Sequence, residues 1–368
     1  MSALHINPFF FESQSDRWSF TDRVDERAHL SAFFPQTGRR LLVHGRRRMG
    51  KTSLLKNAAL ASKAVLLYVD VSTVTSYAHL ARKLMEAAPE TKKGFLERMI
   101  EIAKKHFKSV TVTAGKIALA GDLRVEDEQT LEQALNYLNE CAALSDQPWT
   151  ICLDEFQGIR VLGNDRIDWQ IRGIIDAHKA VNYIFSGSDH RLMDWISSYD
   201  SAFFKQLEKM EIGPIEPGHM ARWVDSRTVQ GGLSCDPKFG VKVVASAGPC
   251  TGDIVRLAKS TFDSAAKGSV ADPIATALDA IALIELDSEF ADRWRRLKSL
   301  AQRRVLLAVA AGLQPSAAET LKRFGISSAS TATSAVETLL EVQLLVRTPK
   351  GLHFDSPFFK RWVEVNAN

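Results

Sequence analysis

Short runs of branched apolar residues alternate with helical stretches through the first two thirds of the chain. Their composition predicts strands at residues 39–45, 63–71, 148–156, 181–187 and 210–215. Strands that are rich in Val, Ile and Leu and separated by helical crossovers are typical of a parallel sheet with helices on both faces. This part of the chain is therefore expected to have an α/β fold.

The segment between the second and third predicted strands is long. Several residues recur there at helical spacing and predict a helix: Phe95, Met99, Ile102 and His106. The next residues, 108–123, favour strands, and their glycines suggest a hairpin. We interpret His106 as a packed helix residue rather than a ligand.

The pattern changes twice in the last part of the chain. From about residue 216 to 290 it is wholly helical, which indicates a small helical domain. Beyond residue 290 it predicts helices at about 299–311, 316–324 and 328–341, followed by a hairpin whose turn contains Pro349 and Gly351. Two helices joined by a tight turn, a third helix and a hairpin are typical of a winged helix.

Composition limits the classes of protein that fit. The 368 residues are enough for two or three packed units, and 45% hydrophobic with 24% charged residues is a globular composition. We find no apolar run of roughly 18 residues and no export signal at the start, so a cytoplasmic protein without a membrane span is expected. The four cysteines lack metal-binding spacing and are interpreted as buried thiols. A net charge of +4 permits an anionic partner without requiring one.

The segment GRRRMGKT, residues 45–52, lies between a predicted strand and a predicted helix. This spacing fits a phosphate-binding loop, in which glycines let backbone N–H groups surround phosphate oxygens. Lys51 is expected to reach the β and γ phosphates, and Thr52 to offer its hydroxyl to Mg²⁺. A basic surface turn is the alternative, which the flanking strand and helix disfavour. The candidate nucleotide contacts of the loop are Gly45, Arg46, Arg47, Arg48, Met49, Gly50, Lys51, Thr52 and Ser53.

The strand WTICLDEF ends in two carboxylates, Asp154 and Glu155. The carboxyl edge of a parallel sheet would place both beside the phosphate loop. Asp154 is then expected to hold Mg²⁺, through water or together with Thr52. Glu155 is left to orient and deprotonate the attacking water.

With these motifs the chain resembles the AAA+ branch of P-loop ATPases. Within that branch it is similar to the archaeal-type ATPase family with a C-terminal winged helix, which is related to origin-recognition and STAND ATPases. The resemblance spans essentially the whole chain, through NPFF…FTDRVDERAHL, GRRRMGKTSLL, LDEFQ, FSGSDHRLM, GPCTGDIVRLA and DSPFFKRWV. It implies an AAA+ (ASCE) P-loop core over residues 1–215, a helical lid over 216–290 and a winged-helix domain over 291–368. It also implies an Mg²⁺-dependent ATPase that binds ATP and ADP. The departures from the family pattern described below indicate that turnover is slow without a partner.

The resemblance also assigns roles to residues outside the loop. Residues 7–23 are expected to wrap the adenine, with Pro8, Phe9 and Phe20 as apolar contacts. Arg23 is expected to anchor this segment to the sheet. The alternative is that the segment only packs on the core. Ser186 and Ser188 stand where such ATPases place a polar sensor, although a serine after a strand is also ordinary turn chemistry. An arginine pair before the glycine-lysine is usual in the family, so the loop arginines are interpreted as nucleotide or domain contacts rather than a DNA patch.

Two departures from the family pattern affect hydrolysis. The segment Phe203–Gln206 has no arginine, so no arginine finger is assigned there. Thr251 stands where a proline is usual, and nearby Arg256 is interpreted either as a second sensor or as an exposed helix arginine.

The role of the winged helix stays open at this stage. No lysine or arginine lies between Arg323 and Arg347, which weakens the case for double-stranded DNA because basic side chains supply most duplex affinity. The hypotheses are therefore an ATPase that repositions its lid and winged-helix domains, a DNA-binding ATPase, and a slow nucleotide switch whose winged helix binds a protein partner. A homo-oligomer is compatible with each of them.

Overall fold

The computed structural model describes residues 5–9, 21–90, 93–107, 110–113, 116–119, 128–162, 167–188, 196, 198–199, 201–203, 205–234, 236–268, 271–349 and 351–367. The chain forms two compact units. The first, here called the sheet unit, is Ser13–Gly213, and the second, the helical unit, is Met1–Glu12 with Pro214–Asn368.

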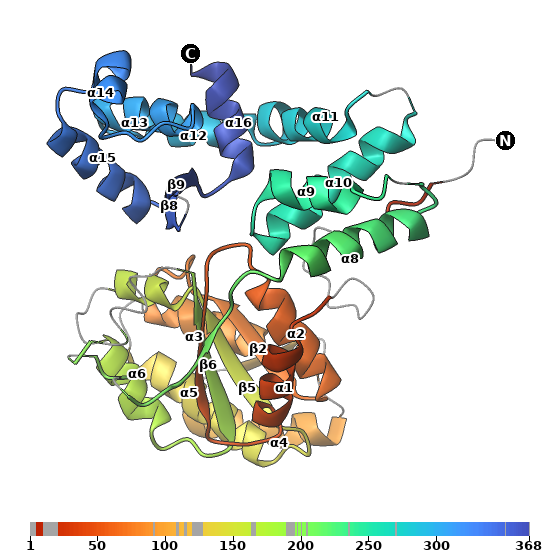
Figure 1. Cartoon of the computed structure of the whole chain (residues 1–368). Coiled ribbons are helices and arrows are strands. Elements are labelled where there is room, and N and C mark those ends of the chain that lie inside the picture. Colours follow the sequence, from red (N-terminus) through yellow and green to blue (C-terminus); the bar gives the residue numbers. More distant parts are fainter. Residues whose placement is uncertain are drawn as a thin grey trace. The chain divides into compact units, whose positions relative to one another are not determined.

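The sheet unit is built on a five-stranded parallel sheet (Figure 1), so the predicted fold class is confirmed. The strand order is β2-β5-β6-β1-β7, and the strands are β1 (Arg40–His44), β2 (Val65–Asp70), β5 (Trp149–Asp154), β6 (Val181–Gly187) and β7 (Glu208–Glu211). Every residue of β5 and β6 is buried, as expected of central strands between two helical layers.

The last strand lies earlier than the sequence predicted. It was expected at 210–215 and spans Glu208–Glu211. Ile212 still donates its N–H to the carbonyl of His44, at 2.7 Å, but Pro214 has no N–H with which to continue the ladder. The strand therefore ends where the chain leaves the sheet unit.

Helices cover both faces of the sheet, with α1 and α2 on one side and α3, α5 and α6 on the other (Figure 1). Their bounds are α1 (Val24–Phe33), α2 (Lys51–Ala61), α3 (Tyr77–Glu86), α4 (Lys93–His106), α5 (Glu128–Ala143), a 3-10 helix η1 (Phe156–Leu162) and α6 (Ile167–Ile175). The predicted hairpin is present as antiparallel β3 (Val110–Thr113) and β4 (Lys116–Leu119).

The helical unit holds the predicted helices and the winged helix. Its elements are α8 (Pro217–Gln230), α9 (Phe239–Ala247), α10 (Thr251–Ala266), α11 (Pro273–Ala280), a π-helix η2 (Ile281–Glu285), α12 (Asp287–Arg295), α13 (Leu300–Ala310), α14 (Ala318–Phe324), α15 (Ala329–Glu341), β8 (Leu345–Thr348), β9 (Gly351–Phe354) and α16 (Pro357–Asn366). A single apolar core runs from Met220 in α8 to Val363 in α16. Helices α8–α11 and the winged helix therefore pack as one body.

The N-terminal stretch belongs to the helical unit. The ring of Phe9 is 2% exposed and lies edge-on to Trp223 and Phe262, at centroid distances of 5.6 and 6.3 Å. The side-chain amide of Asn7 donates to the carbonyl of Lys259 at 3.0 Å and to the carboxylate of Asp263 at 2.7 Å. This stretch is thus fixed to α8 and α10.

No helix among the described residues combines the length and the apolar character that a bilayer span requires.

Candidate nucleotide-binding site

The loop between β1 and α2 has the backbone geometry of a phosphate cradle. A β-carbon on Gly45 would lie 2.3 Å from the carbonyl oxygen of Ile212, the residue after β7, so only glycine fits there. Gly50 has φ 88°, a left-handed conformation that glycine adopts without strain, and α2 begins directly after it. The N–H groups at the start of α2 therefore lie at the end of the loop, where an anion would be bound.

Lys51 is buried under this loop, with 7% of the side chain exposed. Its ammonium donates to the carbonyls of Gly45 at 2.6 Å and Arg46 at 3.0 Å. Burial lowers the pKa of Lys51, while the negative charges of Glu155 and Asp154 act in the opposite direction. The lysine therefore gains from any further anion at the loop, because that anion would compensate its lost hydration.

Arg23 contacts the backbone of the loop. Its guanidinium is 6% exposed and donates to the carbonyls of Met49, at 3.0 Å, and Gly213, at 2.6 Å. Glu26 forms an ion pair with it at 2.9 Å. Arg23 thus joins the phosphate loop to the last residue of the sheet unit, which is consistent with its expected pinning role.

The other loop side chains differ in exposure. Met49 is buried at 3%, Arg46, Arg48, Thr52 and Ser53 are half-buried, and Arg47 is exposed. The Nε of Arg47 lies 3.3 Å from the hydroxyl of Ser188, which connects the loop to the end of β6.

The two carboxylates end β5 at the same edge of the sheet as the loop. They are not on the strand next to it, however, because β6 lies between β5 and β1. Their charges still act on the pKa of Lys51, so the three groups share one site.

Asp154 and Thr52 are connected by a tyrosine that the sequence analysis did not single out. The Tyr68 hydroxyl on β2 lies 3.0 Å from Thr52 Oγ1 and donates to Asp154 Oδ2. Burial and the Asp154 charge raise the pKa of Tyr68 well above its ordinary value, so it is a neutral donor. β2 pairs with β5 with Tyr68 opposite Cys152, two residues before Asp154, so the two side chains lie on one face of the sheet.

The surroundings of the second carboxylate oxygen of Asp154, Oδ1, favour a bound metal ion. Oδ1 is buried and has no hydrogen-bond partner within the described structure. A buried carboxylate oxygen without a partner is costly, and a hard cation held with the Thr52 hydroxyl would satisfy it. No group of three or more His, Cys, Asp or Glu that could hold a metal is found over the described ranges.

Glu155 is held by its neighbours. The Ser188 hydroxyl lies 2.9 and 2.8 Å from its two carboxylate oxygens, and the amide of Gln157 donates to one of them. Glu155 itself has φ 50°, an unusual conformation for a non-glycine residue. Ser186, two residues earlier on β6, is fully buried and its hydroxyl has no partner in the described part of the chain. Only one of the two sensor candidates therefore contacts Glu155.

The remaining candidates do not belong to the described sheet unit. Pro8, Phe9 and Arg256 belong to the helical unit, where Arg256 forms an ion pair with Glu285 at 3.6 Å. Phe20 falls outside the described residues.

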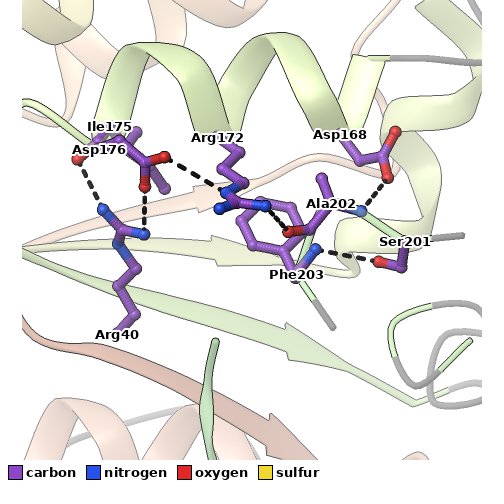
Figure 2. Close-up of polar contacts among 8 residues, drawn as sticks. All are labelled: Arg40, Asp168, Arg172, Ile175, Asp176, Ser201, Ala202 and Phe203. Atoms are coloured by element: carbon purple, nitrogen blue, oxygen red, sulfur yellow. Dashed lines mark hydrogen bonds and ion pairs between the residues drawn. The ribbon is translucent and has the colours of Figure 1, made fainter. Parts of the chain in front are cut away.

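The segment before Lys205 is anchored to α6 (Figure 2). Ala202 donates its N–H to the buried Asp168 at 3.1 Å and accepts from Arg172 at 2.7 Å. Arg172 also contacts Asp176, which forms an ion pair with Arg40 at 2.6 Å. These contacts hold Phe203, which is 1% exposed, against the aromatic core.

Comparison with known proteins agrees with this architecture. The family described as "Probable winged helix domain" matches residues 288–365. The chain is similar to the Walker-type ATPase paby2304 of Pyrococcus abyssi, with a TM-score of 0.69 and 15% identity over 97% of this chain and 100% of that one. The chain has the fold of P-loop ATPases with a C-terminal winged helix.

Two origin-recognition structures show the same fold. The chain is similar to the ORC2 protein of Aeropyrum pernix in ADPNP–ADP complexes, with a TM-score of 0.58 and 14% identity over 94% of this chain and 93% of that one. For the ORC1 protein of the same organism in complex with DNA, the TM-score is 0.50 and the identity 13%, with the same coverage. No curated protein matches the sequence. The fold expected from the resemblance is thereby confirmed.

Proposed function

We propose that the chain binds ATP with Mg²⁺ in the loop of residues 45–52 and hydrolyses it to ADP and phosphate. One observation carries the proposal. The buried ammonium of Lys51 and the carboxylates of Asp154 and Glu155 lie at one edge of the sheet, and the charges of the two carboxylates act on Lys51. This arrangement supplies the groups that phosphoryl transfer requires, at the site where a phosphate cradle begins a helix.

The protein groups would act as follows. The backbone N–H groups at the start of α2 bind phosphate oxygens, and Lys51 exchanges its bonds to the loop carbonyls for bonds to the β and γ phosphates. Thr52 and Asp154 hold Mg²⁺, which when bound neutralises charge on the phosphates. Glu155 accepts a proton from the attacking water once its contact with Ser188 is released.

The proposal includes a mechanical consequence of nucleotide binding. Arg23 holds the carbonyl of Met49 in the loop and that of Gly213, where the sheet unit ends. A change in the loop on binding ATP would therefore act on the connection to the helical unit. Because the lid helices and the winged helix share one core, they would be repositioned together.

Binding and turnover test the function separately. Lys51→Ala should abolish nucleotide binding in a titration with a fluorescent ATP analogue, since it removes the only buried ammonium described at the loop. Glu155→Gln should retain binding and lose hydrolysis. Lys179→Ala, an exposed lysine before β6, is the matched control and should bind normally. Wild-type protein that neither binds nor hydrolyses ATP would contradict the proposal.

A slow nucleotide switch is the second candidate, and the contacts of Glu155 favour it. Ser188 and Gln157 already occupy both oxygens of this carboxylate, which leaves it little freedom to activate water. Nucleotide retained through purification together with negligible turnover would identify the switch.

The partner of the winged helix belongs to the same proposal. The A. pernix ORC1 neighbour is in complex with DNA. In this chain, however, α15 uses its hydroxyls internally, with Thr333 and Thr338 donating to the carbonyls of Ala329 and Ser334. Arg347 is paired with Glu337 at 2.5 Å. We therefore favour a protein partner, and duplex binding that weakens steeply with salt would show DNA instead.

A further inference from the structure

Tyr68 stands between the two groups that are proposed to hold the metal. Its hydroxyl contacts Thr52 Oγ1 at 3.0 Å and donates to Asp154 Oδ2. We propose that this bridge, Thr52–Tyr68–Asp154, closes the metal site and that Mg²⁺ has to open it. The inference rests on the proposed function and adds a residue that sets how much Mg²⁺ the site needs.

The chemistry of the phenol makes the bridge complete. A phenol has one proton to donate, which goes to Asp154, and its oxygen can accept the proton of the Thr52 hydroxyl. The Thr52 hydroxyl and Asp154 Oδ2 therefore each have the phenol as a hydrogen-bond partner, without a cation. Only Asp154 Oδ1 is left without a partner in the described structure.

The position of the ring is fixed from two sides. On β2, Tyr68 lies opposite Cys152 of β5, which brings its side chain to the face of the sheet that also carries Asp154. The ammonium of Lys56, one turn further along α2 than Thr52, lies 5.0 Å from the centroid of the ring. The bridge is therefore a product of the sheet register and α2 together, rather than a chance contact of a mobile side chain.

Mg²⁺ and the phenol would compete for Thr52 and Asp154. The ion takes six oxygens at about 2.0–2.1 Å in a nearly ideal octahedron, which the phenol oxygen between Thr52 and Asp154 would obstruct. Opening the bridge breaks two hydrogen bonds, one of them to a charged group. That loss weakens the binding of Mg²⁺ but not the binding of metal-free nucleotide, which uses the loop and Lys51.

The test is a Mg²⁺ titration of Tyr68→Phe. Protein bound to a fluorescent ADP analogue in chelator is titrated with buffered Mg²⁺, and the half-saturating concentration is compared with that of the wild type. Loss of the bridge should lower this concentration about five- to tenfold, since it removes hydrogen bonds that compete with the metal. Affinity for the nucleotide in excess chelator should stay within about twofold. An unchanged or higher Mg²⁺ requirement would overturn the inference.

Two further variants keep the result interpretable. Tyr183→Phe removes a phenol hydroxyl from β6, where Tyr183 lies opposite Ile151 and so faces the other side of the sheet from Tyr68, and it should leave the Mg²⁺ requirement unchanged. Tyr68→Leu removes the hydroxyl with a different side chain and should lower the requirement as Tyr68→Phe does. Wild-type protein that binds no nucleotide with or without Mg²⁺ contradicts the proposed function. Normal wild-type binding with no shift in Tyr68→Phe contradicts only the bridge.

Discussion

The hydroxyl of Ser188 lies 2.9 and 2.8 Å from the two carboxylate oxygens of Glu155. The first residue follows β6 and the second follows β5, two adjacent strands that end at the same edge of the sheet. Arg47 of the phosphate loop contacts the same hydroxyl at 3.3 Å. A nucleotide that draws Arg47 towards its phosphates would therefore disturb the contact that holds Glu155.

Removing this contact should release Glu155. We expect Ser188→Ala to raise basal ATP turnover about fivefold, because the carboxylate loses a hydrogen bond of about 1 kcal/mol that competes with its proposed role as a base. Steady-state phosphate release at saturating ATP measures the change. The double variant Ser188→Ala with Glu155→Gln should stay inactive, which shows that the gain passes through Glu155. A fall in turnover would mean that Ser188 orients the base productively.

Much of the fold follows from the sequence because buried parallel strands are nearly continuous apolar runs. β6 was predicted at its observed bounds for this reason. The strand β7 was displaced because its residues Glu208–Glu211 are mostly charged and gave a weaker pattern than the Ile-rich residues after them. The helix α16 was missed, although Ser356 followed by Pro357 is a capping signal that could have found it.

The candidate site was only partly predictable. The phosphate loop and the carboxylates are encoded in local spacing, which is why the sequence shows them. The role of Tyr68 is not encoded in local spacing. It depends on the register between β2 and β5, two strands separated by about eighty residues of chain. The location of Phe9 could not be predicted from the sequence either, because its partners Trp223 and Phe262 lie far from it along the chain.

Arg23 should be sensitive even to a conservative change. Lysine keeps the charge but lacks the planar fork that lets one side chain bind the carbonyls of Met49 and Gly213 together with Glu26. We expect Arg23→Lys to lose about 1–3 kcal/mol of stability, because it leaves a buried carbonyl without its donor. Nucleotide affinity should fall as well, since the loop loses support. Thermal unfolding and a nucleotide titration measure the two effects, with the exposed Arg27→Lys on the same helix as control.

His178 should make the sheet unit sensitive to mild acid. Burial lowers the pKa of His178 to about 4, and the ring lies 2.6 Å from the Tyr183 hydroxyl and 2.8 Å from Asn136. Between pH 6.5 and 4 the unfolded chain therefore binds a proton that the folded chain does not, so stability falls as pH decreases through this window. The loss from neutral pH to pH 5 should be at most about 2 kcal/mol.

Urea unfolding at a series of pH values measures this slope. His178→Gln keeps an amide that can bond to Tyr183 and Asn136 but cannot titrate, so it should be less stable at pH 7.5 and lose less stability on going to pH 5. A variant with the same slope as the wild type would assign the acid sensitivity to other groups.

The helical unit should lose stability as a whole when α16 is weakened. Trp362 is 6% exposed, packs against Phe359 and Trp294, and donates its indole N–H to Asp287 at 2.8 Å. Its neighbour Arg361 forms a forked ion pair with Asp279 of α11, at 2.6 and 3.3 Å. Helix α16 thus contacts α11, which precedes the winged helix, as well as α12.

We therefore expect Trp362→Ala to cost about 3–5 kcal/mol and to speed amide hydrogen exchange in α11 and α12 as well as in α13 to α16. Because the core is continuous, the loss of one large side chain at its end should be felt across it. Val365→Ala, at an exposed position of the same helix, is the control and should leave exchange unchanged. Faster exchange confined to α13–α16 would show that the winged helix opens independently, and the lid and winged helix would then be separate bodies after all.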